Sequence, residues 1–249
     1  MADKSMVIFG VRPVMEALEA GREIERIFLK RGSDSPVVQR LTALALQRRV
    51  DVAHVPTEKL DRMVRGNHQG VAAIMAMIDY ASLDDVIERA GQSAIVVLLD
   101  GVTDVRNFGA IARSAECAGA DAVVVSAKNG AQVNSEALRS SAGALTRLPV
   151  CRVGSVRNAI RQLKNSGFKI AAATEKGDTP LWNGDLTGRV AIVMGSEDKG
   201  ISKESLKLCD QQLAIPIAGG ISSLNVSVAA GILIFEVLRQ RETGGRTSR

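Results

Sequence analysis

The segment "GGISSLNVSVAAGILIF", residues 219–235, joins a polar, glycine-rich opening to an almost unbroken apolar run. The run from Val226 to Leu238 is interrupted by polar residues and is far shorter than the ~20 residues that span a bilayer, so it predicts a buried helix and no membrane span. Two serines and Asn225 stand at its start, where Ser and Asn are preferred capping residues. Capping explains one of these three polar residues, and it leaves Leu224 and the preceding glycines unexplained.

Before this helix, apolar runs alternate with amphipathic segments from Ala94 onward. The runs predict strands at 94–100, 121–126, 149–153, 168–174, 189–195 and 212–217, and the other segments predict helices at 107–119, 135–147, 155–167 and 202–209. Strands of continuous Val, Ile, Leu and Ala favour a parallel sheet that is covered on both faces. In open sheets of this kind ligands bind beyond the carboxyl ends of the strands, so those loops are the candidate site.

A smaller pattern of helices and strands precedes this one. Helices are expected at 12–21, at 35–48 and after Pro56, and strands at 26–30, 50–55 and 70–77. Residues 79–93 are acidic and polar with one short amphipathic stretch, which is typical of a linker or a docking helix. The sequence therefore predicts an α/β protein with a small domain at 1–78, a linker at 79–93 and a larger domain at 94–249.

The composition favours a folded protein with a polyanionic partner. The chain has 249 residues, of which 46% are hydrophobic, and a net charge of +5 with a pI near 9.3. Aromatic residues make up only 3%, so contacts to phosphate and sugar are favoured over base stacking. The basic residues of the small domain are either phosphate contacts or solvated surface charges. They are Arg22, Arg26, Lys30, Arg31, Arg48 and Arg49.

The cysteines and histidines do not form a metal-binding pattern. The three cysteines are widely separated and lack a C-x-x-C pair, which argues against disulfides and against a thiolate metal site. His54 and His68 do not stand in a zinc-binding spacing, and His68 reads as a turn or packing residue. We therefore expect no metal. The first residues lack the pattern of a secretory signal, so a cytoplasmic location is expected.

One strand-to-helix junction carries an unusual charge. In "LLDGVTDVRNFGAIARSAECAG", Arg113 lies nearly two turns into a helix made otherwise of small and apolar residues. A guanidinium near the apolar side of a helix is expected to have an anionic partner. That partner could be a ligand, or Glu116 or Asp104 in a plain ion pair.

A second junction, "AIVMGSEDKGIS", is a strand that ends in Gly195 and is followed by a glycine-bounded turn. It is not a phosphate-binding loop, because Ile201 stands where such a loop needs Lys and because Glu197 and Asp198 would repel phosphate. We expect glycine here to let a neutral or cationic ligand approach the backbone closely.

Together and in this order, three segments resemble the motifs of the SpoU (TrmH) family of RNA ribose 2'-O-methyltransferases within the SPOUT class. The segments are "NFGAIARSA", "MGSEDKGIS" and "IPIAGGISSLNVSVAAGI". The small domain, with "FGVRPVMEAL" and "GNHQGVAAIM", resembles the substrate-binding domain, similar to ribosomal protein L30e, of the subgroup that modifies a guanosine in 23S rRNA.

The resemblance implies S-adenosylmethionine (AdoMet) as cofactor, 23S rRNA as partner and a trefoil knot in the larger domain. It also implies a homodimer with the last helix in the interface. The alternatives are a tRNA ribose 2'-O-methyltransferase and a noncatalytic RNA-binding assembly protein with the same fold.

The resemblance also assigns site residues. The main chain of Gly195, Ile215 and Leu224 would hold the cofactor, and Met194, Ser196 and Pro216 would shape its pocket. The catalytic set would be Asn107, Arg113, Glu197, Ser223 and Asn225.

Within that set, Asn107 would orient the ribose and Glu197 would fix Arg113 or the motif loop. Ser223 and Asn225 would position Arg113 and the substrate. A guanidinium, whose pKa lies above 12, is a poor base, so we expect Arg113 to stabilise the developing alkoxide.

Overall fold

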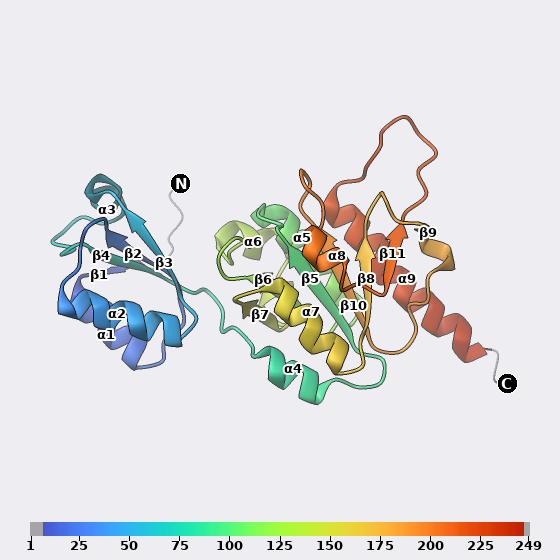
Figure 1. The fold of residues 1–249 in the computed structure, drawn as a ribbon, viewed down its shortest axis with the longest axis horizontal. Coiled ribbons are helices and arrows are strands. Elements are labelled where there is room, and N and C mark those ends of the chain that lie inside the picture. The colour runs from blue at the N-terminus through green and yellow to red at the C-terminus, as the bar shows by residue number, and fades with distance from the viewer. Residues whose placement is uncertain (1–6, 247–249) are drawn as a thin grey trace. The chain divides into compact units, whose positions relative to one another are not determined.

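The computed structural model describes residues 7–246, which fold as two compact units (Figure 1). The first unit holds the described residues up to Asp79 together with Val133–Ser135, and the second holds the rest. No helix within this range is both long enough and apolar enough to cross a membrane.

The first unit is a four-stranded mixed sheet with helices on both faces. Its strands are β1 (Val7–Phe9), β2 (Ile24–Lys30), β3 (Asp51–Val55) and β4 (Val71–Met75), in the order β1-β4-β2-β3. Its helices are α1 (Val11–Glu19), α2 (Pro36–Gln47) and α3 (Thr57–Met63). Strand β2 is parallel to β3, whereas β4 is antiparallel to both β1 and β2.

Alternation along the strands builds the two cores of this unit. Ile27 and Leu29 pack against residues of α1 and α2, and Phe28 between them packs with Leu60 of α3 on the other face. The predicted helices and strands are confirmed. Strand β1 was not predicted, because a three-residue edge strand shows no periodicity.

The second unit holds a seven-stranded parallel sheet. Its strands are β5 (Ile95–Asp100), β6 (Ala122–Ser126), β7 (Val150–Val153), β8 (Lys169–Ala173), β9 (Thr179–Pro180), β10 (Val190–Gly195) and β11 (Gln211–Ala214). They lie in the order β7-β6-β5-β10-β8-β11-β9, and every pair is parallel. The prediction of a parallel sheet is confirmed. The trefoil knot depends on how the chain threads through itself, and it stays a prediction.

Helices cover both faces of this sheet, as expected (Figure 1). One face carries α4 (Leu83–Arg89), α7 (Val156–Asn165) and α8 (Lys203–Leu206), and α5 (Val105–Cys117) packs with α9 (Val226–Arg246) against the other. The segment expected as a linker or docking helix contains α4. Leu83 and Val86 of this helix are buried in the core of the second unit, and Ala81 pairs with Cys151.

Besides the two-residue strand β9, which no apolar run predicted, two elements differ from expectation. The helix expected at 135–147 divides into α6 (Ser135–Ser140) and the 3-10 turn η1 (Ala144–Thr146). Between them Ala142 and Gly143 have φ angles of 49° and 90°, which a continuous helix cannot contain. Strand β11 ends at Ala214, three residues before the expected end, so that the following segment leaves the sheet.

Candidate active site

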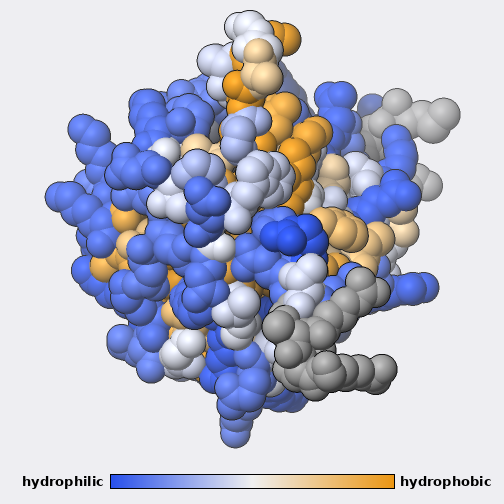
Figure 2. Space-filling model, turned by 90° about the vertical axis from the view of Figure 1, so that its right-hand side faces the viewer, coloured by the Kyte–Doolittle hydropathy of each residue, from blue (hydrophilic) through white to orange (hydrophobic). Residues whose placement is uncertain are grey.

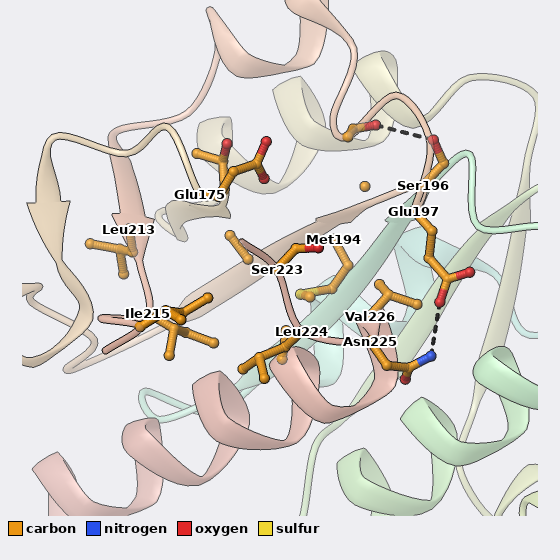
Figure 3. A pocket seen from close by; sticks show the side chains of 16 residues that line it. Glu175, Met194, Ser196, Glu197, Leu213, Ile215, Ser223, Leu224, Asn225 and Val226 are labelled. Carbon is orange, nitrogen blue, oxygen red and sulfur yellow. Dashed lines mark hydrogen bonds between the residues drawn. The ribbon is translucent and has the colours of Figure 1, made fainter. Parts of the chain in front are cut away.

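A pocket of about 270 Å³ lies at the carboxyl ends of three neighbouring strands and the start of the last helix (Figure 3). Residues from the ends of β8, β10 and β11 line it, together with the segment that enters α9. This is the position that the sheet pattern predicted for a ligand. Its lining includes Glu175, Met194, Gly195, Ser196, Glu197, Leu213, Ile215, Ser223, Leu224 and Asn225.

The turn after β10 forms the first wall. Ser196 and Gly200 exchange backbone hydrogen bonds of 3.1 and 2.8 Å, which closes the turn. A Cβ on Gly195 would lie 2.2 Å from the backbone of Gly200 and Ile201. This glycine makes room for the chain folding back on itself. Gly195 also lines the pocket, so the expectation that it lets a ligand approach the backbone stays a prediction, although the fold already requires glycine here.

The segment between β11 and α9 forms the opposite wall. Residues 216–225 are all exposed, and within the described part of the chain no backbone hydrogen bond is formed by residues 215–224. Ile215 and Leu224 line the pocket, as does Ser223, whereas Pro216 does not. Unpaired backbone N–H and C=O groups beside a pocket are available to a ligand.

A cluster of three polar side chains stands at one end of the pocket. Asn107 Nδ2 donates to Glu197 Oε1 at 3.0 Å, and Asn225 Nδ2 donates to the same oxygen at 2.8 Å. Asn225 Nδ2 also donates to Asn107 Oδ1 at 3.0 Å. Figure 3 shows Glu197 and Asn225 facing each other across this bond. Three loops that are far apart in the sequence thus meet at one carboxylate.

Helix caps hold two members of this cluster in place. Asn225 Oδ1 accepts from Ser227 N at 2.9 Å, so the residue caps α9 while its amide nitrogen bonds the cluster. Asp104 caps α5 by accepting from the backbone of Asn107 and Arg106 at 2.9 and 2.8 Å. The bond from Asn107, followed by that from Arg106, lowers the pKa of Asp104. The prediction that Asn225 caps a helix is confirmed. Capping uses only its Oδ1 atom, because Nδ2 donates to the cluster.

Arg113 does not join the cluster. It lies six residues after Asn107 on α5, which places it about 9 Å further along the axis and about 240° around it. Its side chain is exposed, and among residues 7–246 it forms no hydrogen bond or ion pair. Within one chain Glu197 therefore does not hold Arg113, and its hydrogen bonds join the motif loop to Asn107 and Asn225 instead.

The plain ion-pair alternative for Arg113 is also wrong. Glu116 is 3.9 Å from Arg147, and Asp104 serves as the helix cap. Nor do Ser223 and Asn225 position the guanidinium in this chain. The helix places Arg113 on a solvent-facing side, not near the apolar side as the pattern suggested.

Glu175 is a pocket residue that the sequence reasoning missed. It follows β8, in a turn where Thr174 N bonds Leu213 O at 3.0 Å and Gly177 N bonds Thr174 O at 3.1 Å. The available signal was the same as at the other junctions, because the polar stretch "EKGD" directly follows an apolar strand. In Figure 3 its carboxylate lies away from Glu197, beyond Ser223.

The charges of the lining favour a cationic ligand. Two carboxylates, Glu175 and Glu197, line the pocket, and no Lys or Arg of the described chain does. Met194, Leu213 and Ile215 supply an apolar wall between them. AdoMet has this chemistry, since its adenine is largely apolar and its sulfonium and ammonium groups are positive. The residues present therefore fit that cofactor. Within residues 7–246 no group of three or more His, Cys, Asp or Glu could hold a metal ion.

Two family models match the chain in the order of its units. The SpoU rRNA Methylase family matches residues 94–235, and the model for RNA 2'-O ribose methyltransferase substrate binding matches residues 7–81. The 23S rRNA (guanosine-2'-O-)-methyltransferase RlmB of Pseudomonas syringae is 35% identical over 238 residues, covering 94% of this chain and 95% of the relative. Other relatives over a similar length are described as tRNA/rRNA methyltransferases.

Solved structures show the same architecture. The SpoU methyltransferase AviRb from Streptomyces viridochromogenes, in complex with AdoMet, is 29% identical with a TM-score of 0.61, covering 95% of this chain and 90% of its own. The TrmH/SpoU tRNA modifying enzyme of A. aeolicus is 30% identical with a TM-score of 0.57. That match covers 67% of this chain and 84% of the other.

Proposed function

This chain belongs to the SpoU rRNA methylase family of AdoMet-dependent RNA ribose 2'-O-methyltransferases, and we propose from this premise that its substrate is the ribose of a guanosine in 23S rRNA. The observation that supports methyl transfer to a ribose is the junction of Asn107, Glu197 and Asn225 beside a pocket that suits a cation. An enzyme with this substrate would work in the cytoplasm.

The cluster offers a defined position for a ribose hydroxyl. AdoMet supplies the methyl group to be transferred. Both amide bonds fall on Glu197 Oε1, so Oε2 has no hydrogen-bond partner among the described residues. That oxygen can accept a bond from the 2'-hydroxyl and orient it, which contributes the alignment that methyl transfer requires. The amide of Asn107 lies within reach of the same ribose.

The cofactor residues follow from the walls of the pocket. We infer that the main chain of Gly195, Ile215 and Leu224 holds the adenosine, with Met194 and Ser196 shaping the site. The unpaired backbone between β11 and α9 supports this assignment, because adenine is recognised through hydrogen bonds to such groups. Pro216 lies outside the lining, so we expect it to act through the shape of the loop.

We infer a homodimer that involves α9 and the loop before it. Figure 2 shows apolar surface exposed on one side of the molecule. Val228 and Phe235 of α9 are 50% and 49% exposed, and Ile221 in the loop is 78% exposed. Large apolar side chains gathered on one helix and its adjoining loop favour a protein partner, which a second copy of the chain supplies.

The dimer gives Arg113 a place in the reaction. This side chain is exposed and distant from the cluster in its own chain, yet α5 packs against α9. A second copy on α9 therefore brings one chain's Arg113 toward the other chain's ribose site. We propose that the guanidinium stabilises the developing alkoxide there.

The identity of the RNA rests on the first unit. The relative named for 23S rRNA aligns with 94% of this chain, whereas the tRNA-modifying structure covers 67%. A substrate-binding unit of about 75 residues that is shared with the former supports ribosomal RNA.

In vitro methylation tests the substrate. The protein is incubated with labelled AdoMet and either unmodified 23S rRNA transcript or unmodified bulk tRNA, and labelled positions are mapped by alkaline-resistant cleavage. We expect label at the 2'-oxygen of one guanosine in 23S rRNA. Label in tRNA alone would make the chain a tRNA methyltransferase, and AdoMet binding without transfer to either RNA would favour a noncatalytic assembly role.

A further inference from the structure

One end of the four-stranded sheet in the first unit carries exposed cations from four separate segments. The register places the carboxyl ends of β2 and β3 together, since Lys30 pairs with Val55. It places the start of β4 and the end of β1 there as well, because Leu29 pairs with Val71 and Phe9 with Ala72. The exposed cations at this end, called the basic end below, are Arg12, Lys30, Arg31, Lys59 and Arg65.

Close contacts fix these segments at the basic end. Lys30 lies over Gly70, where a Cβ would be 3.2 Å from the Lys30 Cβ. The chain beside Arg65 is held against Phe9, whose ring would be 3.0 Å from a Cβ on Gly66. Lys59 Nζ lies 5.3 Å from the ring centre of Phe28. The cations therefore stand on structured backbone, and their spacing is set by the fold.

The cations of the basic end lack acidic partners. Among the described residues, Arg12, Lys30, Arg31 and Arg65 form no side-chain hydrogen bond or ion pair. Two of the carboxylates nearby are engaged elsewhere, since Asp61 bonds His68 at 3.0 Å and Asp34 bonds Gln39 at 2.8 Å, whereas Glu58 lies beside Lys59 in the first turn of α3. Helix α1 also starts at this end with no acidic residue in its first turn.

The opposite end of the same sheet has a different charge balance. Arg26 there forms an ion pair with Asp51 at 2.8 Å, and Glu23 and Glu25 are close in sequence. Arg22, Arg48 and Arg49 also lie at that end, before β2 and β3. The sequence left six basic residues of this unit as either phosphate contacts or surface charges, and the structure divides them between the two ends of the sheet. Of these six, only Lys30 and Arg31 belong to the basic end.

The loop between α3 and β4 adds hydrogen-bonding groups to the basic end. His68 is buried as a turn residue, with Nδ1 accepting from Gly70 N at 2.9 Å, so it is not available to a ligand. Asn67 and Gln69 on either side are exposed, with Asn67 Oδ1 accepting from Gln69 N at 3.3 Å and Gln69 Oε1 accepting from Val11 N at 3.4 Å, so that within the described chain their amide NH₂ groups remain for a ligand. Exposed amides between cations suit a sugar–phosphate backbone, which offers acceptors and hydroxyl groups.

We propose that the basic end binds the phosphates of the RNA substrate and so positions the RNA for the second unit. This inference rests on the proposed function for the choice of RNA, and it adds which surface of the first unit makes the contact. No exposed aromatic residue of the described chain accompanies the five cations of the basic end. RNA binding there therefore depends on charge and not on base stacking.

The test compares two triple variants of the full chain. The first, Lys30→Ala, Arg31→Ala and Arg65→Ala, removes three charges from the basic end. The matched control, Arg22→Ala, Arg48→Ala and Arg49→Ala, removes three from the opposite end. Binding of unmodified 23S rRNA transcript is measured by filter retention between low and moderate salt, with thermal melting to compare folding.

We expect the first variant to bind the transcript about tenfold more weakly. The slope of log K against log[salt], which is negative, should become less steep by about 2. The control should stay near wild type in both. A charge-conserving variant, Lys30→Arg with Arg31→Lys, should also keep the slope. Equal losses in both triple variants, or no loss in either, would overturn the proposal.

Binding of the transcript is separate from methyl transfer, which distinguishes the two failures. A wild-type protein that methylates 23S rRNA but binds it equally well in all variants would contradict the basic end alone. A wild-type protein that neither binds nor methylates the transcript would contradict the proposed function.

Discussion

Two amide side chains share one carboxylate oxygen at the candidate active site. Replacing Asn107 by Ala removes one donor to Glu197, whose other oxygen is proposed to orient the ribose, while the pocket walls are unchanged. We expect the methyl-transfer rate to fall about 10²-fold, because a positioned polar group at the reacting centre is worth that much.

Binding of AdoMet, measured by calorimetry, should stay at the wild-type level in Asn107→Ala. The matched control is Asn158→Ala, an exposed amide on α7 that should leave the rate unchanged. Loss of AdoMet binding together with the rate would place Asn107 in the cofactor site instead.

Glu175 is the second carboxylate of the pocket, and it forms no hydrogen bond or ion pair among the described residues. Its charge should attract the positive groups of AdoMet. We expect Glu175→Gln to weaken AdoMet binding roughly three- to tenfold, which is about the net contribution of one ordinary hydrogen bond. Asp178→Asn removes the same charge from the same turn outside the lining and should have no effect.

A neutral analogue identifies which part of the cofactor meets Glu175. We expect 5'-methylthioadenosine, which lacks the ammonium and sulfonium charges, to bind Glu175→Gln and wild type equally. An equal loss of affinity for both compounds would assign the carboxylate to the ribose or the adenine.

At the residue scale, the sequence predicted about half of the residues that line the pocket, but not the contacts between them. The motif residues from β10 and the loop before α9 lie on one pocket because glycines and caps fix the local backbone. The direction in which the Arg113 side chain points could not be predicted. It depends on how α5 is rotated about its axis, which the cap at Asp104 sets. Glu175 was missed because a polar turn after a strand is common in any protein.

At the scale of elements, the turn between β10 and α8 depends on a close approach of two backbone segments. An Ala at position 195 would place its Cβ 2.2 Å from the backbone of Gly200 and Ile201, so the turn has to open. We expect Gly195→Ala to destabilise the fold by about 1–3 kcal/mol, the usual cost of overpacking, and to weaken AdoMet binding.

Thermal melting and AdoMet titration check this variant. Gly154→Ala is the control, because no atom lies within 4 Å of the added methyl group there. An unchanged melting temperature in Gly195→Ala, with normal AdoMet affinity, would contradict the role given to this close approach.

The break in the helix expected at 135–147 shows what periodicity misses. Gly109 on α5 packs so closely that a Cβ would lie 2.6 Å from Ala137 O on α6. Ser141, fully buried, bonds Leu138 O at 2.9 Å with its hydroxyl, and the chain then turns through Ala142 and Gly143. The apolar spacing fits a helix on both sides of that turn, so only the packing against α5 reveals it.

At the scale of the whole molecule, a dimer makes each active site depend on two chains. We expect the Arg113→Ala and Asn107→Ala proteins each to keep only about a hundredth of wild-type activity alone, and to regain about a quarter of it when mixed and re-equilibrated. Half of the dimers are then mixed, and one of two sites in each has both residues intact.

No recovery on mixing, with exchange of chains demonstrated by native mass spectrometry, would place Arg113 and Asn107 in the same chain's site. The control is Phe235→Glu, which puts a charge on the exposed face of α9 and should yield monomers that do not complement. Dimers that persist in this variant would move the interface away from α9.

The sequence also predicted the two units and the parallel sheet, but not the order of the strands. Continuous apolar runs indicate that a sheet is buried on both faces. They do not reveal that β10 lies between β5 and β8, because the pairing of β10 with β5 joins residues far apart in the chain, such as Val190 and Ile95. That order brings the ends of β8, β10 and β11 together, and so it creates the pocket.

The central claim is that this pocket holds the methyl donor beside the Asn107, Glu197 and Asn225 cluster. A crystal structure of the protein grown with AdoMet or S-adenosylhomocysteine tests it most directly. The account predicts density for the adenosine between Met194 and Leu224, bonded to main-chain groups of the surrounding loops. A donor bound elsewhere on the protein, with this pocket filled by side chains, would contradict the account.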